Sequence, residues 1–379
     1  MAWEGTFEIP PRDPALSDSI KRTHPPREPV HIEAAALHGR IVYFAVTGPW
    51  DRPQVPIERD TILSIGKSNL IIQTSVTILL LIAGSYLAFR NHRSGRGDRV
   101  GALRMAIAFL VLGLLAWALR THHVPDLIFE FTLFTNAMGQ LLYLVALVWI
   151  FYLALEPYVR RVWPETIISW SRFISGKWAD PLVGRDVLIG GLVGVVSLLL
   201  TQVELLAPRW PGLFQGNAPM PYFSSADAML HSCSNYAALF SGGISSMYYA
   251  LILLFFLVLV RLITRRRWSA CVIFVVVLVA ATARWNVAHW VPESALSWAI
   301  QTVTALLFLM VLTRFGLVAI IACFLCRMLL SDFPIAPDFN LWYGNSSIVA
   351  IVSVLALLGV SFYTSLGGKP LFSLRVLDA

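Results

Sequence analysis

Side chains able to bind a metal ion or a small ligand occur in a few short polar segments of this sequence. Asp227 and His231 are four residues apart, so both would lie on one face if that segment is helical. Imidazole and carboxylate groups bind zinc, and histidine also titrates near neutral pH. Together with His289 from a later segment, they form the candidate ligand site. Histidines beside apolar runs are also common as plain interfacial residues. Other histidine, aspartate and cysteine side chains in or near the loops predicted on the same, outer side of the membrane are His122, His123, Asp126 and Cys233.

The residue patterns of several catalytic classes are absent. No two glutamates are neighbours, and neither HExxH nor GxSxG occurs, so intramembrane, metal and serine proteolysis lack their motifs. Cys323 and Cys326 form a CxxC pair, but an apolar run is a poor place for redox or zinc chemistry. The sequence therefore predicts no catalytic residue and no cofactor, and it assigns no metal centre.

The elements that must position these residues are membrane helices. The chain is 57% hydrophobic and only 13% charged, which is typical of an integral membrane protein. A hydrocarbon core of about 30 Å requires roughly 20 apolar residues for each helical crossing. We expect an all-α polytopic fold with about nine transmembrane helices. The apolar runs are 69–89, 102–119, 131–155, 187–204, 238–260, 269–283, 296–313, 315–330 and 346–364.

The loops between these runs are alternately rich and poor in Lys and Arg, and cytoplasmic loops are the ones that retain positive charge. This alternation predicts that the N-terminus is outside and the C-terminus is cytoplasmic. The net charge of +7 forms no continuous basic face, so the predicted partner is the lipid bilayer and not nucleic acid. The basic residues in the loops that are rich in Lys and Arg are Arg90, Arg93, Arg96, Arg99, Arg160, Arg161, Arg172, Lys177, Arg185, Arg261, Arg265, Arg266, Arg267 and Arg314.

Residues 1–65 differ from the rest and are predicted to form an extracytoplasmic segment. Prolines from Pro10 to Pro29 indicate an extended, loop-like start. Two β-prone runs, 31–37 and 41–47, flank a break at Gly39 and predict a β-hairpin. No signal peptide is predicted. The multi-span membrane domain is expected over residues 66–369, with a cytoplasmic tail at 370–379.

The connection at residues 156–186 is the most charged and aromatic part of the chain. Trp163, Ile167, Trp170, Ile174 and Trp178 recur at helical spacing, which predicts an amphipathic helix at the cytoplasmic surface of the membrane. A surface that binds a partner protein would have the same pattern. The predicted interfacial or partner surface consists of Arg160, Arg161, Trp163, Trp170, Arg172, Lys177 and Trp178.

The stretch "EPYVRRVWPETIISWSRFISGKWADPLVGRD" resembles the membrane portion of large bacterial membrane-anchored serine/threonine protein kinases of the acidobacterial type. "AWEGTFEIP", "HIEAAALHGRIVYFAVTGPWDRP" and "SDFPIAPDFNLWYGNSSIVAIVSVLALLGVSFYTSLGGKPLF" agree with this resemblance, which spans nearly the whole chain. The resemblance implies a multi-pass protein of the bacterial inner membrane, in which a kinase domain and one crossing would precede this region.

Kinase chemistry itself is not expected in this chain. The glycine-rich loop, the paired lysine and the catalytic-loop and metal-binding aspartates are absent. "GRD" at Gly184–Asp186 lacks the preceding histidine, and "SDFP" at Ser331–Pro334 lacks the glycine of the metal-binding motif. The chain is therefore predicted not to be an enzyme.

Two functions remain open. The first is a membrane anchor or sensor module in signal transduction, with a kinase domain or another cytoplasmic signalling protein as its partner. The second is a small-molecule transporter or permease, which nine crossings would allow. Transporters usually carry ionisable residues near mid-membrane, whereas Arg104, Glu204 and Arg284 lie near predicted span ends.

Gly190 and Gly194 are spaced for close helix packing.

Overall fold

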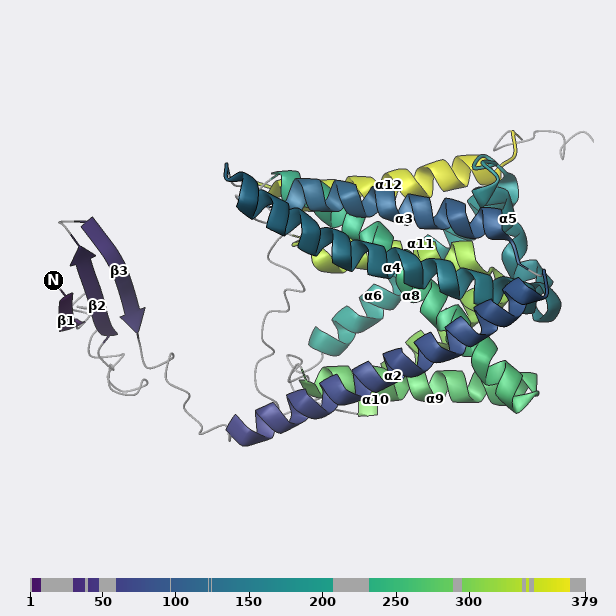
Figure 1. Ribbon diagram of the computed structural model, residues 1–379, viewed down its shortest axis with the longest axis horizontal. Coiled ribbons are helices and arrows are strands. Elements are labelled where there is room, and N and C mark those ends of the chain that lie inside the picture. Colours follow the sequence, from purple (N-terminus) through teal and green to yellow (C-terminus); the bar gives the residue numbers. More distant parts are fainter. Residues whose placement is uncertain are drawn as a thin grey trace, which may run out of the picture. The chain divides into compact units, whose positions relative to one another are not determined.

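The protein consists of a small N-terminal sheet and a helical bundle, seen in a computed structural model (Figure 1). The structure describes residues 2–7, 30–37, 40–47, 59–95, 97–121, 123, 125–206, 232–288, 295–335, 339–340 and 344–368. The chain divides into two compact units, Met1–Thr74 and Ser75–Ala379. This division lies inside one long helix, α2 (Arg59–Arg93), which also contains the domain boundary that the sequence predicts at residue 65.

Three antiparallel strands form the sheet of the first unit. The order is β1 (Ala2–Phe7), β2 (Val30–Leu37) and β3 (Arg40–Thr47). The two β-prone runs of the sequence fall in β2 and β3, which pair with an irregularity between Ala35 and Ala36. The sequence does not predict β1, because the prolines that follow it indicate a loop-like start. It ends before the first proline, Pro10, so its backbone N–H groups remain free to pair with β2.

The described part of the second unit consists of helices joined by short turns. Eight of the nine predicted apolar runs each lie within one helix, and the run 315–330 begins two residues before the helix Leu317–Asp332. Six of the described helices, α3, α4, α6, α8, α10 and α12, are long and apolar enough to cross a membrane. Besides α2, the helices are α3 (Arg99–Arg120), α4 (Leu127–Val162), α5 (Ile168–Ile174), α6 (Pro181–Leu206), α8 (Ser232–Thr264), α9 (Arg267–Ala288), α10 (Ala295–Arg314), α11 (Leu317–Asp332) and α12 (Gly344–Ser365), with a 3₁₀ turn, η3 (Pro164–Ile167).

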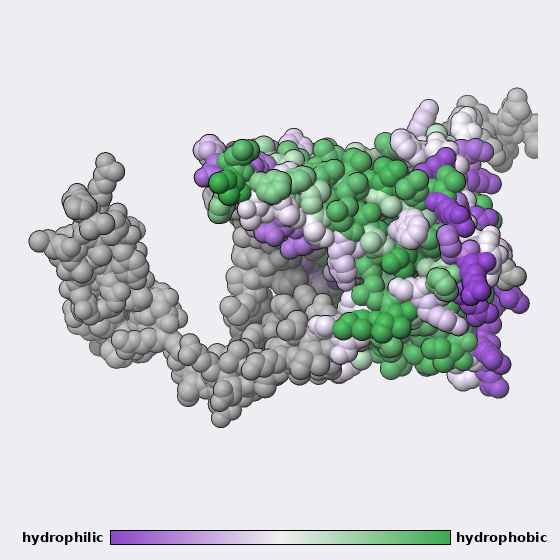
Figure 2. Space-filling view, in the orientation of Figure 1, coloured by the Kyte–Doolittle hydropathy of each residue, from purple (hydrophilic) through white to green (hydrophobic). Residues whose placement is uncertain are grey.

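The outer surface of the bundle is apolar. Leu79, Phe131 and Val352 are each more than half exposed, and Figure 2 shows apolar residues over most of the visible helices. Water-soluble proteins rarely expose apolar patches of this extent, whereas a bilayer covers them. Hydrophilic residues gather at the end of the bundle where α5 lies (Figure 2). We call this end of the bundle the polar end. These features identify a multi-pass membrane protein.

Helices α6 and α11 pack with their backbones in contact. A Cβ atom on Gly190 would collide with the carbonyl oxygen of Ala319, and one on Gly194 would collide with that of Cys323. Side chains larger than hydrogen would therefore separate the two helices. The close packing predicted from the spacing of Gly190 and Gly194 is confirmed.

Pro157 interrupts the hydrogen bonds of α4, and a side chain of α2 compensates for it. Pro157 has no N–H to donate to the carbonyl of Leu153, four residues earlier. The side-chain amide of Asn91 donates to this oxygen at 3.0 Å and to that of Ala154 at 3.1 Å. Asn91 is only 5% exposed, so the pairing saves a buried carbonyl from being left without a donor.

The α6–α11 contact can be tested with Gly190→Ala. Because the added methyl group has no space, we expect a loss of about 1–3 kcal/mol in the free energy of unfolding. The control is Gly359→Ala in α12, where nothing lies within 4 Å of the added Cβ. That variant should be neutral or more stable by about 0.5–1 kcal/mol, because alanine is the better helix former. Unfolding in mild detergent measures both, and equal stability of the two variants would contradict the contact.

Candidate functional site

The three residues of the predicted ligand site, Asp227, His231 and His289, lie outside the described residues. Of the other candidates, Asp126 caps the start of α4, and Cys233 is exposed in the first turn of α8. His123 belongs to the α3–α4 turn. Its Nδ1 lies 2.5 Å from Oε1 of Glu130, and its Nε2 lies 3.2 Å from the carbonyl oxygen of Ala118. Glu130 raises the pKa of His123 above its ordinary value, mainly through this hydrogen bond. Within the described ranges, no group of His, Cys, Asp and Glu could hold a metal ion.

The segment between α4 and α6 is not the single amphipathic helix that the tryptophan spacing predicts. α4 ends at Val162, η3 begins at Pro164, and α5 is only seven residues long. Gly176 has a φ of +87°, a left-handed conformation that ends the helical geometry after α5. Proline and glycine therefore divide the segment into short pieces, and the side chains no longer share one face.

Trp170 is buried in the bundle and is not part of the surface to which the sequence assigned it. It is 2% exposed, with its ring centroid 6.3 Å from that of Tyr152 in α4 and 5.9 Å from that of Phe173. Ile167, one turn earlier, is also buried. Together these side chains anchor α5 to the end of α4. Arg104 of α3 adds a hydrogen bond of 3.2 Å to the carbonyl oxygen of Ile174 at the end of α5.

The other predicted surface residues lie at the polar end in different environments. Trp163 is half-buried and caps α4, its N–H donating to the carbonyl oxygen of Val159 at 2.8 Å. Arg160 forms an ion pair with the buried carboxylate of Glu156. Arg161, Lys177 and Trp178 are exposed, Trp178 by 69%. These three side chains are the part of the predicted surface most accessible to a partner.

Arg172 and Asp180 close the loop that links α5 to α6. Nη1 of Arg172 lies 2.8 and 2.9 Å from the two carboxylate oxygens of Asp180. Asp180 also accepts from the N–H of Leu182 at 3.0 Å, so it caps the start of α6. Burial opposes the charge on Asp180, but the hydrogen bonds from Arg172 and Leu182 outweigh it, and the pKa of Asp180 is lowered.

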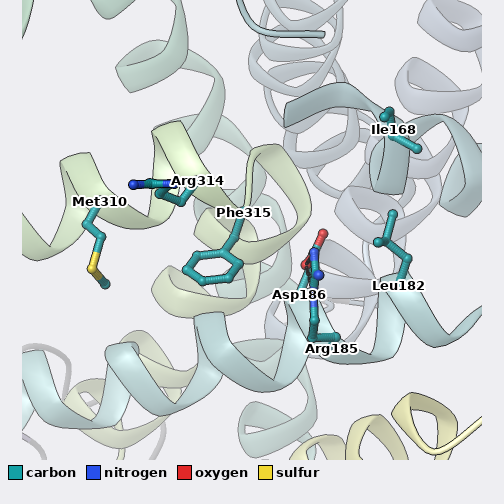
Figure 3. Close-up of a pocket in the computed structure, with 7 residues that line it drawn as sticks. All are labelled: Ile168, Leu182, Arg185, Asp186, Met310, Arg314 and Phe315. Carbon is teal, nitrogen blue, oxygen red and sulfur yellow. Dashed lines mark hydrogen bonds and ion pairs between the residues drawn. The ribbon is translucent and has the colours of Figure 1, made fainter. Parts of the chain in front are cut away.

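A pocket of about 670 Å³ opens at the polar end, among α5, α6 and the end of α10. Figure 3 shows Met310, Arg314 and Phe315 on one side and residues of α6 on the other. The lining residues are Ile168, Leu182, Arg185, Asp186, Met310, Arg314 and Phe315. The pocket thus combines apolar side chains, two guanidinium groups and one carboxylate.

Asp186 holds Arg185 in position at this pocket. Its Oδ1 accepts from Nε of Arg185 at 3.0 Å and from Nη2 at 2.8 Å. The Asp186 side chain is 3% exposed, whereas that of Arg185 is 51% exposed. The guanidinium carbon of Arg185 lies 5.9 Å from the centroid of the Phe315 ring, within the range of a cation–π contact. The positive charge therefore faces outward and the negative charge inward.

The turn between α10 and α11 places Arg314 and Phe315 at the pocket. Gly316 has a φ of +85°, and a Cβ atom at this position would collide with the carbonyl oxygen of Thr166 in η3. The N–H groups of Phe315 and Gly316 both donate to the carbonyl oxygen of Val311, at 2.9 and 3.0 Å. Glycine is thus required both for the turn and for its contact with η3.

A second polar cluster lies deeper in the bundle and was not predicted. Arg327 of α11 donates to the hydroxyl groups of Ser197 at 3.4 Å and Thr201 at 3.2 Å, both on α6. Further along α6, Glu204 accepts from Gln301 of α10 at 3.4 Å. Arg327 is a charge within the predicted span 315–330, and counting charges in each span would have found it. No such sequence pattern could have predicted the pocket, because its lining residues are far apart in the chain.

Comparisons with protein-family models, with curated proteins and with solved structures found no match to this chain. The geometry of the polar end and the resemblance in the sequence are therefore the grounds for a functional proposal.

The ion pair between Arg172 and Asp180 gives a pH-dependent prediction. Because the pKa of Asp180 is lowered on folding, the pair stabilises the folded state above the unfolded pKa of about 3.9, and this stabilisation is lost as the pH falls through the folded pKa. Arg172→Gln should raise the pKa of Asp180 and reduce the loss of melting temperature between neutral and acidic pH. Arg161→Gln removes a charge from the same segment and is the control; the same pH profile for both variants would contradict the assignment.

Proposed function

We propose that the chain is a membrane anchor and sensor module, related to the membrane portion of bacterial serine/threonine protein kinases and acting in signal transduction. In this proposal the bundle crosses the bacterial inner membrane nine times, with the N-terminus outside and the C-terminus in the cytoplasm. A kinase domain or another cytoplasmic signalling protein would dock on residues 156–186. A ligand or lipid would bias the packing of the helices, and the polar end would pass this change to the partner.

One observation carries the proposal: the exposed surface of the polar end is attached directly to the helices of the bundle. Trp170 is buried beside Tyr152 of α4, three residues from the exposed end of α5 at Phe173. η3 contacts the α10–α11 turn at Gly316. A shift of α4 or α10 would therefore move α5 and the exposed side chains that follow it.

The location of the positive charge supports the proposed orientation. Asp98, after the basic turn that follows α2, donates from its N–H to Glu156 at 3.4 Å, near the basic end of α4. Arg314, at the end of α10, lies at the pocket with Arg185 of α6. Basic connections that are separate in the sequence thus lie together at the polar end, and cytoplasmic loops are the ones that retain such charge.

The proposed docking surface can be tested in the native host with the double variant Lys177→Ala/Trp178→Ala. Both side chains are exposed, so the bundle should remain folded, while phosphoserine and phosphothreonine on membrane proteins should fall several-fold if a kinase docks here. The control is Arg266→Ala/Trp268→Ala, which removes an exposed cation and an exposed tryptophan from the α8–α9 connection. Quantitative phosphoproteomics at equal amounts of protein provides the measurement. Unchanged phosphorylation in the first variant would refute docking at this surface.

The second candidate is a small-molecule transporter, and the polar cluster around Arg327 favours it. A charged residue within a membrane helix is costly and often functional. Arg327 contacts Ser197 and Thr201, and Glu204 of the same α6 helix contacts Gln301, so polar groups of α10 and α11 both contact α6.

If the protein is a transporter, proteoliposomes that contain it should accumulate a solute from a labelled panel of amino acids, sugars and organic anions. Arg327→Gln should abolish this uptake, while Arg266→Gln at the polar end should leave it unchanged. Uptake that equals that of empty liposomes for every solute would count against transport.

A further inference from the structure

We propose that the pocket at the polar end binds the headgroup of an anionic phospholipid. The phosphate would lie against Arg314 and Arg185, and the first part of the acyl chains would lie against Met310, Phe315 and the neighbouring apolar side chains. This inference goes beyond the sensor role. It depends on the membrane location of the bundle and on the pocket, so it stands even if no kinase partner exists.

The two arginines leave hydrogen-bond donors for a phosphate. A guanidinium group has five N–H donors, and Asp186 accepts two of those of Arg185. The other three are not used within the described residues. Arg314 is exposed at the end of α10, and no ion pair of Arg314 occurs in the described part of the chain. Arginine is well suited to phosphate because its planar donors match two phosphate oxygens at once.

The electrostatics of the pocket favour an anionic over a zwitterionic headgroup. The lining carries two positive charges and one negative charge. The negative charge of Asp186 is buried and neutralised by Arg185, so an entering headgroup meets the guanidinium groups first. Among the lining residues no exposed carboxylate is present to pair with the ammonium of a choline headgroup. Phosphatidylglycerol fits this charge pattern better than phosphatidylcholine.

The apolar lining distinguishes a lipid from a free phosphate ion. Ile168 is 42% exposed and Met310 is 41% exposed beside the two cations. Burial of such side chains against acyl chains is favourable, and a free phosphate would leave them in water. The volume of about 670 Å³ also lies within the roughly 300–1,000 Å³ that small-molecule sites occupy.

The pocket lies at the depth where headgroups are found. Leu182 is in the first turn of α6, and Arg314 is in the last turn of α10. Both helices are long and apolar enough to span the bilayer, so these turns mark the end of the hydrocarbon region. Basic pockets between membrane helices at this depth are suited to anionic headgroups.

The test measures lipid-dependent stability of the full chain in neutral detergent. The melting temperature is recorded as phosphatidylglycerol, phosphatidylcholine, glycerol 3-phosphate or inorganic phosphate is added. We expect phosphatidylglycerol to raise the melting temperature in a saturable manner and the other three to have little effect. An equal rise with either soluble phosphate would assign the pocket to a free anion, and an equal rise with phosphatidylcholine would remove the charge argument. Both results overturn the proposal.

Variants locate the binding. Arg314→Gln should weaken the apparent affinity for phosphatidylglycerol about tenfold, as expected for the loss of one hydrogen bond to a charged group. Arg314→Lys, which keeps the charge, should retain most of the affinity. Arg266→Gln removes an exposed charge outside the pocket lining and should bind as the wild type does.

If Arg314→Gln gives no folded protein, Arg314→Met replaces the charge with a side chain compatible with the end of an apolar helix. Unchanged affinity in the variant that folds overturns the proposal. An equal loss in Arg266→Gln also overturns it, because the effect would then come from overall surface charge. A kinase readout is not involved, so failure of the sensor role and failure of this site remain distinguishable.

Discussion

The architecture depends on the backbone contact between α6 and α11. Lipid tails are as apolar as the helix surfaces, so helices in a bilayer gain little from the hydrophobic effect and instead associate through close van der Waals contact. Gly190 and Gly194 allow that contact against the carbonyls of Ala319 and Cys323. At one end of the helix pair, the contact brings the α10–α11 turn to the start of α6 and so forms the pocket. Further along, it brings Arg327 within hydrogen-bond distance of Ser197 and Thr201.

The absence of water from the bilayer also explains why side chains bond to the backbone where a helix is interrupted. A carbonyl without a donor is costly where water is absent. The side chain of Asn91 supplies the donor that Pro157 removes from α4, and in doing so fixes the end of α2 against α4. Trp170 likewise fixes α5, because its buried side chain holds this short helix against the bundle. Irregular backbone at the polar end is therefore held by specific side chains.

Charges at the polar end divide into those that hold the structure and those that face outward. Arg172 is engaged with Asp180, and Arg160 with Glu156, so these arginines stabilise the connection between α4 and α6. Lys177 and Trp178 are exposed beside them and remain accessible to a partner. Arg185 combines both roles, because Asp186 fixes one side of its guanidinium while the other side faces the pocket. A lipid at the pocket and a protein on the neighbouring surface would thus contact adjacent parts of the polar end.

The sequence by itself determined where the helices lie, since each apolar run coincides with one helix apart from the two residues of the run 315–330 that precede α11, and hydropathy over about 20 residues is a local property. It also indicated the glycine contact, because the spacing of Gly190 and Gly194 is local to α6. It did not determine the direction of Trp170, whose helical spacing predicted a surface position while packing against Tyr152 buries it. Nor did it determine the pocket or the partners of Arg327, which lies 130 residues from Ser197 in the chain. Only the tertiary structure decided these features, because they arise from contacts between helices that local periodicity does not record.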